Sequence, residues 1–139
     1  MAQIIADVMT RDPATVERNE SAAEAARRMA AADAGDVIVV DNGTVCGILT
    51  DRDIAIRLVA RDKGPDTPVA DIVSDDELVT VGPDTSINQA IALVRGKAVR
   101  RLPVVQRGRA VGIVSLGDLA IEEDEDSALA DISAAEGNT

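Results

Sequence analysis

VRRLPVVQRGRAVGIVSLGD, from Val99 to Asp118, is the stretch that decides the fold of this chain. Its apolar run Leu102–Val105 is short, rich in β-branched residues and bounded by charge, which predicts a buried strand. Arg107-Gly108 then provides a tight turn, and Gly112–Ser115 predicts a second strand. The stretch is therefore predicted to form a strand, a turn, a strand and the first turn of a helix.

The predicted helix start is a candidate binding site. Ser115 stands where a helix N-cap is expected, and Asp118 follows three residues later. A carboxylate there faces free backbone N–H groups and the positive end of the helix dipole, so we expect Asp118 to be ionised and fixed. Such a carboxylate accepts two hydrogen bonds from a vicinal diol, which is the arrangement that a ribose presents.

The same pattern occurs 65 residues earlier. Gly47–Asp53 aligns with Gly112–Asp118 without a gap, and 12 of the 42 positions that start at Thr15 are identical at this fixed offset. Upstream, Ala6-Asp7 matches Ala70-Asp71 at an offset of 64. The chain therefore contains an internal duplication.

Each repeat is predicted to have the order β-α-β-β-α, with a short helical turn in front. In the first repeat we expect the turn at Ile4–Met9, a strand at Thr15-Val16, a helix at Ser21–Ala32 ended by Gly35, a hairpin of Val37–Asp41 and Val45–Thr50, and a helix at Asp51–Arg61. In the second we expect the turn at Val69–Ser74, a strand at Val79–Val81, a helix at Ser86–Arg95, a hairpin of Leu102–Gln106 and Ala110–Ser115, and a helix from Leu116 to about Glu125.

Local signals support these bounds. Asn42-Gly43 is typical of a type I′ hairpin turn, and Ser21-x-x-Glu24 and Ser86-x-x-Gln89 are capping boxes. We therefore expect an α+β fold with two repeats, 1–63 and 64–125, and an acidic, flexible tail at 126–139.

The composition limits the possible partners. Hydrophobic residues make up 46% of the chain, but Phe, Tyr and Trp are absent, so aliphatic side chains and backbone would have to hold any bound base. The absence of aromatic rings argues against the usual single-stranded nucleic-acid platforms. The net charge is −11, with seven acidic and no basic residues in 122–139. This charge disfavours nucleic acid and anionic membranes as partners.

Metal, redox and membrane signals are weak. The chain has no histidine, which excludes imidazole metal sites and imidazole acid–base catalysis. Its single cysteine, Cys46, has no second cysteine for an internal disulfide, which fits a reducing cytoplasm, and we expect it to fill a gap in the core. No apolar run approaches the about 20 residues that a membrane span needs, and no signal peptide is recognised.

At this point the residues resemble a known family. Two β-α-β-β-α units that each end in Gly-apolar-apolar-Ser/Thr-x-x-Asp look like tandem cystathionine β-synthase (CBS) domains, together a Bateman module. Arg100–Val105 resembles the family's second strand, and Leu49–Ile54 resembles its strand-to-helix junction. The resemblance covers about residues 3–123 and is closest to small stand-alone bacterial CBS-pair proteins, some linked to hypoxia or dormancy responses.

The resemblance implies a regulatory module without catalytic activity or a required cofactor. Such pairs have pseudo-two-fold symmetry and two clefts for adenosine-containing ligands, namely AMP, ADP, ATP, NAD or S-adenosylmethionine. They commonly form homodimers through helices, and this chain would regulate a protein partner in trans. The alternative is a ligand-free dimeric interaction or stress-response protein. No nucleophile–base pair supports an enzyme.

The second repeat is the favoured ligand site. Asp118 is the candidate for the ribose diol, and Ser115 for a neighbouring hydroxyl or phosphate. An arginine pair would meet phosphate, since guanidinium binds it through two parallel hydrogen bonds. The other candidates are the backbone of Thr80 and Val81, the arginines Arg100 and Arg101, and the aliphatic walls Leu102, Pro103 and Ile113. Ser115 and Asp118 also suit a plain helix cap without a ligand.

The first repeat is expected to hold a weaker, differently selective or empty site. Its candidate residues are Thr15, Val37, Ile48, Thr50, Arg52 and Asp53. Gly35 and Asp36 replace the arginine pair, and Asp36 would repel a phosphate. Arg52 would compensate for that repulsion or form a surface salt bridge.

Two glycines at equivalent positions, Gly47 and Gly112, have two interpretations. They serve a twist or bulge in the strand, or they let a ligand approach the backbone. The sequence leaves both open.

Overall fold

A computed structural model describes residues 3–74, 78–97, 99–115, 117 and 119. The predicted helix from Leu116 to about Glu125 lies almost entirely outside these residues, and the predicted acidic tail lies wholly outside them. The helical elements are η1 (Ile5–Asp7), α1 (Ala22–Ala32), α2 (Asp51–Asp53), η2 (Ile54–Leu58), η3 (Val59–Arg61), η4 (Val69–Asp71) and α3 (Ile87–Val94). The strands are β1 (Thr10–Arg11), β2 (Thr15–Glu17), β3 (Asp36–Asp41), β4 (Thr44–Thr50), β5 (Arg101–Gln106) and β6 (Arg109–Ser115).

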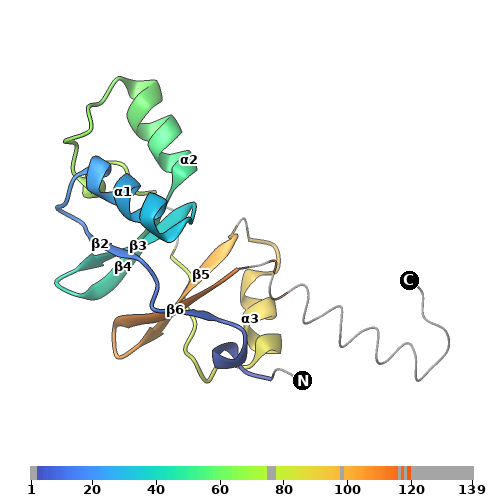
Figure 1. Ribbon diagram of the computed structural model, residues 1–139. Helices are drawn as coiled ribbons and strands as arrows, with labels where there is room; N and C mark the ends of the chain where they lie inside the picture. The colour runs from blue at the N-terminus through green and yellow to red at the C-terminus, as the bar shows by residue number, and fades with distance from the viewer. Residues whose placement is uncertain (1–2, 75–77, 98, 116, 118, 120–139) are drawn as a thin grey trace.

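The described residues form two lobes, each built on a three-stranded sheet (Figure 1). The first lobe has the strand order β2-β3-β4, with β2 parallel to β3 and β3 antiparallel to β4. The second lobe has the order β1-β6-β5, with both pairs antiparallel. The predicted mixed fold of two related repeats is confirmed.

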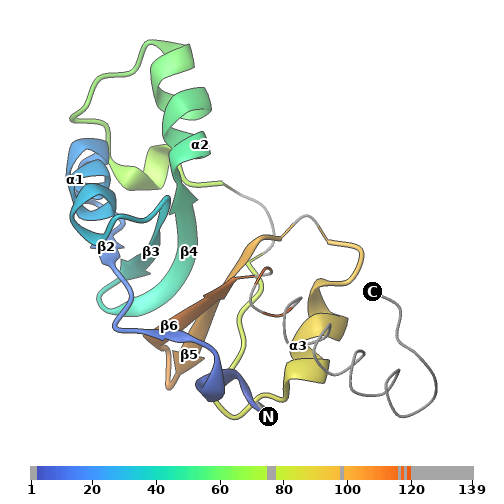
Figure 2. The same cartoon turned by 45° about the vertical axis from the view of Figure 1, so that its right-hand side comes forward.

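The lead segments are exchanged between the lobes. The N-terminal segment lies along the second lobe, where η1 contacts the loop before α3 through the bond from Ile5 N–H to the Thr85 carbonyl at 2.9 Å (Figure 2). In the same way η4 lies on the first lobe, with Val69 N–H donating to the Glu20 carbonyl at 2.8 Å. Each half of the sequence thus completes the core of the other.

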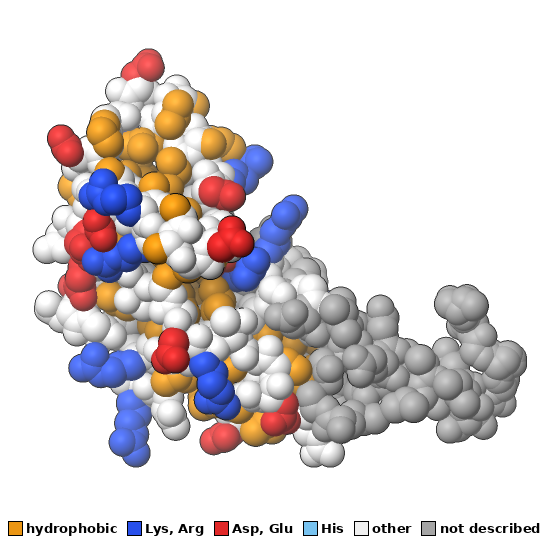
Figure 3. Space-filling view, viewed as in Figure 1, with side chains coloured by type: hydrophobic (Ala, Val, Ile, Leu, Met, Phe, Trp, Pro, Cys, Tyr) orange, Lys and Arg blue, Asp and Glu red, His pale blue; other side chains and the backbone are white. Residues whose placement is uncertain are grey.

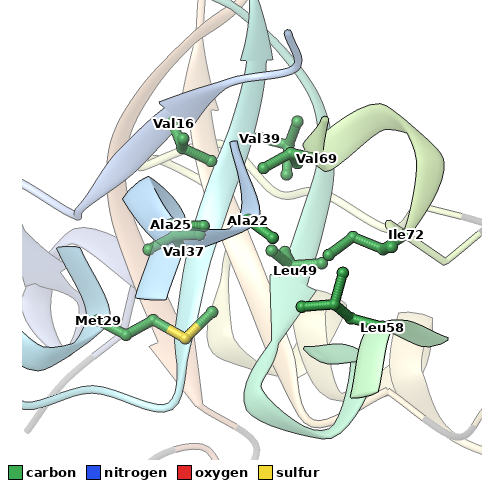
Figure 4. Close-up of a cluster of buried hydrophobic side chains, with 10 residues drawn as sticks. All are labelled: Val16, Ala22, Ala25, Met29, Val37, Val39, Leu49, Leu58, Val69 and Ile72. Carbon is green, nitrogen blue, oxygen red and sulfur yellow. The ribbon is translucent and has the colours of Figure 1, made fainter. Parts of the chain in front are cut away.

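Each lobe has its own aliphatic core. The first-lobe core consists of Val16, Ala22, Ala25, Met29, Val37, Val39, Leu49, Leu58, Val69 and Ile72 (Figure 4). The second-lobe core consists of Ile5, Val81, Ile87, Ala90, Val94, Leu102, Val104, Val114 and Leu119. A third group, the inter-lobe cluster, contains Ile38, Val40 and Ile113, with Val45, Ile48 and Ala110 packed against it. This cluster joins the two sheets.

The turns and caps follow the local sequence closely. Asn42 and Gly43 both have positive φ, 53° and 84°, as a type I′ turn requires. Ser86 and Gln89 form the predicted capping box. At α1 the Ser21 side chain accepts the Glu24 N–H at 3.1 Å.

Two details of α1 differ from the prediction. The Glu24 carboxylate binds Arg27 and Arg28, so the second half of the predicted capping box is replaced by ion pairs. The helix ends at Ala32 as predicted, but the residue that ends it is Asp33, in the left-handed conformation at φ 52°, and not Gly35. An aspartate tolerates this conformation better than most residues, because its short side chain can bond locally.

The predicted strand Val79–Val81 is reduced to one parallel bridge, Val81 to Val104. In the first lobe the equivalent β2 is held by bonds from Ile38 N–H to the Ala14 carbonyl and from Arg18 N–H to the Val40 carbonyl. The second repeat has Pro103 and Pro83 at the donor positions, and proline has no N–H. Two ladder bonds are therefore lost, which explains the shorter pairing.

Cys46 is exposed, so the prediction that it fills the core is wrong. The pairing of β3 with β4 shifts between Val39 and Val40, which face Gly47 and Val45. Cys46 is the extra residue of this bulge, and a bulge interrupts the alternation on which the prediction relied.

Candidate functional site

Three of the predicted site residues, Thr50, Arg101 and Ser115, lie at the open end of the two hairpins. The pair Asp36 and Thr50 lies at the open end of the β3–β4 hairpin, away from its turn. The equivalent pair Arg101 and Ser115 lies at the open end of the β5–β6 hairpin. Thr50 and Ser115 are the last residues of their strands. This end therefore brings together a hydroxyl from each repeat and two residues of opposite charge.

The first repeat shows a fixed carboxylate at a helix start. Asp53 Oδ2 accepts the Thr50 N–H at 2.9 Å, and the Thr50 hydroxyl accepts the Asp53 N–H at 3.1 Å. Asp53 Oδ1 lies 3.6 Å from Arg57 Nε, and the Asp53 side chain is 13% exposed. The local geometry that the sequence predicts for Asp118 thus exists at the equivalent Asp53. Asp118 itself lies outside the described residues.

An ion pair joins the two lobes at this end. Arg101 Nε lies 3.1 Å from Asp36 Oδ2, and the Asp36 side chain is 8% exposed. Asp36 and Arg101 are equivalent positions of the two repeats. Equivalent residues that touch each other lie at the pseudo-two-fold axis, so the ion pair marks that axis.

The charges around Asp36 oppose one another. Burial raises the pKa of the Asp36 carboxyl, the neighbouring Arg101 guanidinium lowers that pKa, and the Asp51 carboxylate raises it again, with the pKa above its ordinary value as the net result. Asp51 is close because its N–H donates to the Gly35 carbonyl at 2.9 Å. Arg101 therefore offsets a buried charge that the protein otherwise disfavours.

Strand alternation divides the predicted aliphatic walls. Pro103 and Ile113 are paired across β5 and β6, and Ile113 belongs to the inter-lobe cluster, as Ile48 does. Leu102 and Val37 are each 1% exposed and lie in the second-lobe and first-lobe cores. Neighbouring residues of a strand point to opposite faces, so Leu102 points away from the inter-lobe side that Ile113 faces.

The remaining candidates differ in their accessibility. Thr80, Arg100 and Arg52 are exposed. Val81 donates its N–H to the Pro103 carbonyl and accepts from Val105 N–H, so both of its backbone groups are already paired with β5. In the first repeat the half-buried Thr15 accepts the Arg28 guanidinium at 2.7 Å through its carbonyl.

The two glycines make room for the exchanged lead segments. A Cβ on Gly112 would lie 2.5 Å from Met9 Sδ and 3.0 Å from the Thr10 carbonyl oxygen. A Cβ on Gly47 would lie 3.2 Å from Val73 Cγ2. Both glycines also border the bulge of their hairpin. The close approach is thus to another part of the same chain, which favours the structural interpretation.

Sequence reasoning missed the bond between Asp36 and Arg101. It treated Asp36 only as a residue that would repel phosphate in the first repeat. The signal was available, because the repeat alignment places an acid and a base at the same position.

Comparison with known proteins identifies the family. A model of the CBS domain matches the chain twice, at residues 5–60 and 65–124. The chain belongs to the CBS domain family. CBS domains are in general regulatory modules without catalytic activity. No helix in the part of the chain that the structure describes has both the length and the apolar character to cross a membrane.

Three similar proteins illustrate the relationship. The CBS domain-containing protein YhcV of Bacillus subtilis is 42% identical over 133 residues, which cover 93% of this chain and 94% of YhcV. The crystal structure of Hypoxic Response Protein I, which has two coordinated zinc ions, has a TM-score of 0.72 and 31% identity, and covers 86% of this chain and 98% of that chain. The crystal structure of CBSX2 in complex with AMP has a TM-score of 0.70, and the match covers 89% of this chain and 98% of the CBSX2 chain. At 24% identity this likeness shows the fold alone.

Proposed function

We propose that this CBS pair is a non-catalytic sensor, which binds an adenosine-containing ligand in the cleft between its repeats and regulates a protein partner in trans. One observation carries the proposal. A capping carboxylate and an arginine lie at the open end of the two hairpins, and Ile48 and Ile113 of the aliphatic inter-lobe cluster lie two residues further along the strands. These groups suit a ribose diol, an adenine ring and a phosphate in turn.

The second repeat is the proposed main site. Its arginines Arg100 and Arg101 are both exposed enough to reach a ligand, and Ser115 is half-buried at the end of β6. We assign the ribose to Asp118 by its equivalence to the fixed carboxylate of Asp53. The first-repeat site has Asp36 and Gly35 in place of the arginines, so we propose weaker or different binding there.

AMP, ADP, ATP, NAD and S-adenosylmethionine are the proposed ligand class. The CBSX2 structure contains AMP, which says that this fold can hold such a ligand. The proposal for this chain nevertheless rests on its own residues, because the identity to CBSX2 is low. We also propose a cytoplasmic location and a homodimer.

The first experiment asks whether a ligand accompanies the purified protein. The chain has no Trp or Tyr, so near-ultraviolet absorbance of the native sample reports a bound chromophore. The protein is denatured, and the released molecule is identified by chromatography and mass spectrometry. We expect an adenosine compound, or binding of at least one of AMP, ATP, NAD and S-adenosylmethionine by calorimetry.

Two substitutions test the assigned residue. Asp118→Asn keeps an oxygen acceptor but loses the charge, and we expect at least a tenfold loss of affinity because the ribose hydrogen bonds become neutral. Asp66→Asn, at an exposed loop position, removes the same charge as a control and is expected to bind normally. Normal binding by the Asp118 variant would contradict the site assignment.

The alternative is a ligand-free interaction or stress-response protein. The likeness to Hypoxic Response Protein I favours it, and so do the exposed apolar residues Ile56 and Val59, which are 42% and 64% exposed. Figure 3 shows apolar side chains at the surface of the first lobe. Calorimetry without heat for any of the four ligands would support this alternative.

A further inference from the structure

The ion pair between Asp36 and Arg101 engages a guanidinium that the proposed function assigns to phosphate. Arg101 Nε lies 3.1 Å from Asp36 Oδ2, while the Arg101 side chain is still 43% exposed. The Arg101 side chain is therefore accessible to a ligand that enters from solvent. Any such ligand meets the Asp36 carboxylate at the same place.

A phosphate at Arg101 has two ways to bind, and both carry a cost. If it displaces Asp36, a carboxylate that is only 8% exposed loses its partner and stays buried. If it binds beside Asp36, the two negative groups repel each other. Asp51 adds a second negative charge close by, since it also raises the pKa of Asp36.

The cost grows with the number of phosphates. A single phosphate can share the exposed Arg101 side chain with Asp36. A longer chain carries more charge past the same two carboxylates. The charge of Asp36 and Asp51 therefore acts most strongly against polyphosphates.

We infer that Asp36 is a specificity-determining residue, which weakens the binding of polyphosphate chains relative to that of adenosine ligands with at most one phosphate. The inference rests on the proposed function, because it needs a nucleotide whose phosphate approaches Arg101. Asp36 acts from the first repeat on a site assigned to the second.

The test compares AMP with ATP by calorimetry, at constant ionic strength and without divalent cations. Wild-type protein is expected to bind AMP more tightly than ATP. In Asp36→Asn we expect the ratio of the two dissociation constants to shift about tenfold in favour of ATP. Asp41→Asn is the matched control, because Asp41 lies at the other end of β3 and pairs with Arg18 at 3.8 Å at the surface. This control is expected to leave the ratio within twofold of the wild-type value.

A double variant assigns the effect to Arg101. In Asp36→Asn with Arg101→Gln, the gain for ATP is expected to disappear, because the freed guanidinium is absent. Asp36→Ser repeats the measurement with a smaller side chain, and circular dichroism checks the fold of each variant.

The outcomes separate the inference from the proposed function. If wild-type protein binds AMP and the Asp36 variants keep the same ratio, the inference alone is overturned. The same holds if wild-type protein already prefers ATP. If neither the wild-type protein nor the variants bind any of the nucleotides, the proposed function fails and the inference fails with it.

Discussion

Asp36 and Arg101 also make a stability prediction at the scale of single residues. Arg101→Gln leaves the buried Asp36 carboxylate without its partner, and we expect a loss of about 1–3 kcal/mol in the free energy of unfolding at pH 7. Without the guanidinium the pKa of Asp36 in the folded protein rises further above the ordinary 3.8. The folded state then binds this proton more tightly than the unfolded state, so the loss shrinks as the pH falls through the raised pKa.

Urea unfolding followed by circular dichroism, at pH 7 and near pH 4, measures this effect. Arg18→Gln serves as the control, because Arg18 pairs with Asp41 at 3.8 Å and both side chains are about half exposed. A surface pair of this kind contributes less than about 1 kcal/mol. An equal loss in both variants, or a loss that does not depend on pH, would show that Asp36 gains nothing from Arg101.

The chemistry of single residues was more predictable than their surroundings. The hydroxyl cap and fixed carboxylate follow from local backbone geometry, and the structure has them at Thr50 and Asp53. Which way a strand residue points depends on the register of the sheet. For this reason Leu102 lies in a core although it was assigned to the cleft with its neighbour Pro103. The site assignment as a whole stays a prediction.

At the scale of elements, the hairpins and helices were predictable because their signals are short. The exchange of lead segments was not, since the apolar pattern of Ile4–Met9 shows that it needs a core but not which one. The strand β1 in the second-lobe sheet was not predicted either. It pairs with Ile113 and Gly112, which lie about 100 positions away in the sequence. The loss of the strand Val79–Val81 was readable from the two prolines that replace hydrogen-bond donors.

The exchange predicts where a lead-segment mutation acts. Ile5 is fully buried in the second-lobe core, so Ile5→Ala is expected to cost about 2–5 kcal/mol. Hydrogen exchange measured by mass spectrometry should rise in α3, β5 and β6 more than in α1 and β3. Because the substitution removes packing from the second lobe, local opening there becomes easier.

Val69→Ala is the reciprocal control. Val69 is the equivalent residue at the offset of 64, and it is fully buried in the first-lobe core. In the Val69→Ala protein, amide hydrogen exchange should rise in α1 and β3. If Ile5→Ala loosened the first lobe instead, the exchange of lead segments would not hold in solution.

At the scale of the whole molecule, three kinds of contact among the described residues join the two lobes along the pseudo-two-fold axis. The Asp36–Arg101 pair lies at the start of the strands, and the inter-lobe cluster follows it. At the hairpin tips Val45 N–H donates to the Gly108 carbonyl at 2.9 Å. A ligand that alters the ion pair therefore acts at one end of a continuous interface between the lobes. A ligand can shift the populations of two arrangements of the lobes only if it binds one arrangement more tightly than the other.

The surface that remains apolar predicts how copies of the chain associate. Val59 and Ile56 lie on the helical segment that runs from Asp51 to Arg61, and they are 64% and 42% exposed. If the homodimer forms through this segment, Val59→Asp places a charge in an apolar interface, which is unfavourable without a partner. We expect analytical ultracentrifugation to show a dimer for the wild-type protein and a monomer for Val59→Asp.

Leu93→Asp provides the comparison, because Leu93 is 43% exposed on α3, in the other lobe. It adds the same charge to another apolar surface position, and the dimer should persist. Both residues are already in contact with solvent, so neither substitution removes core packing. Both variants should therefore be folded and should show a cooperative unfolding transition. A Val59→Asp protein that still sediments as a dimer would move the interface away from this segment. A monomeric wild-type protein would contradict the proposed homodimer. A ligand would then act on the inter-lobe interface of a single chain.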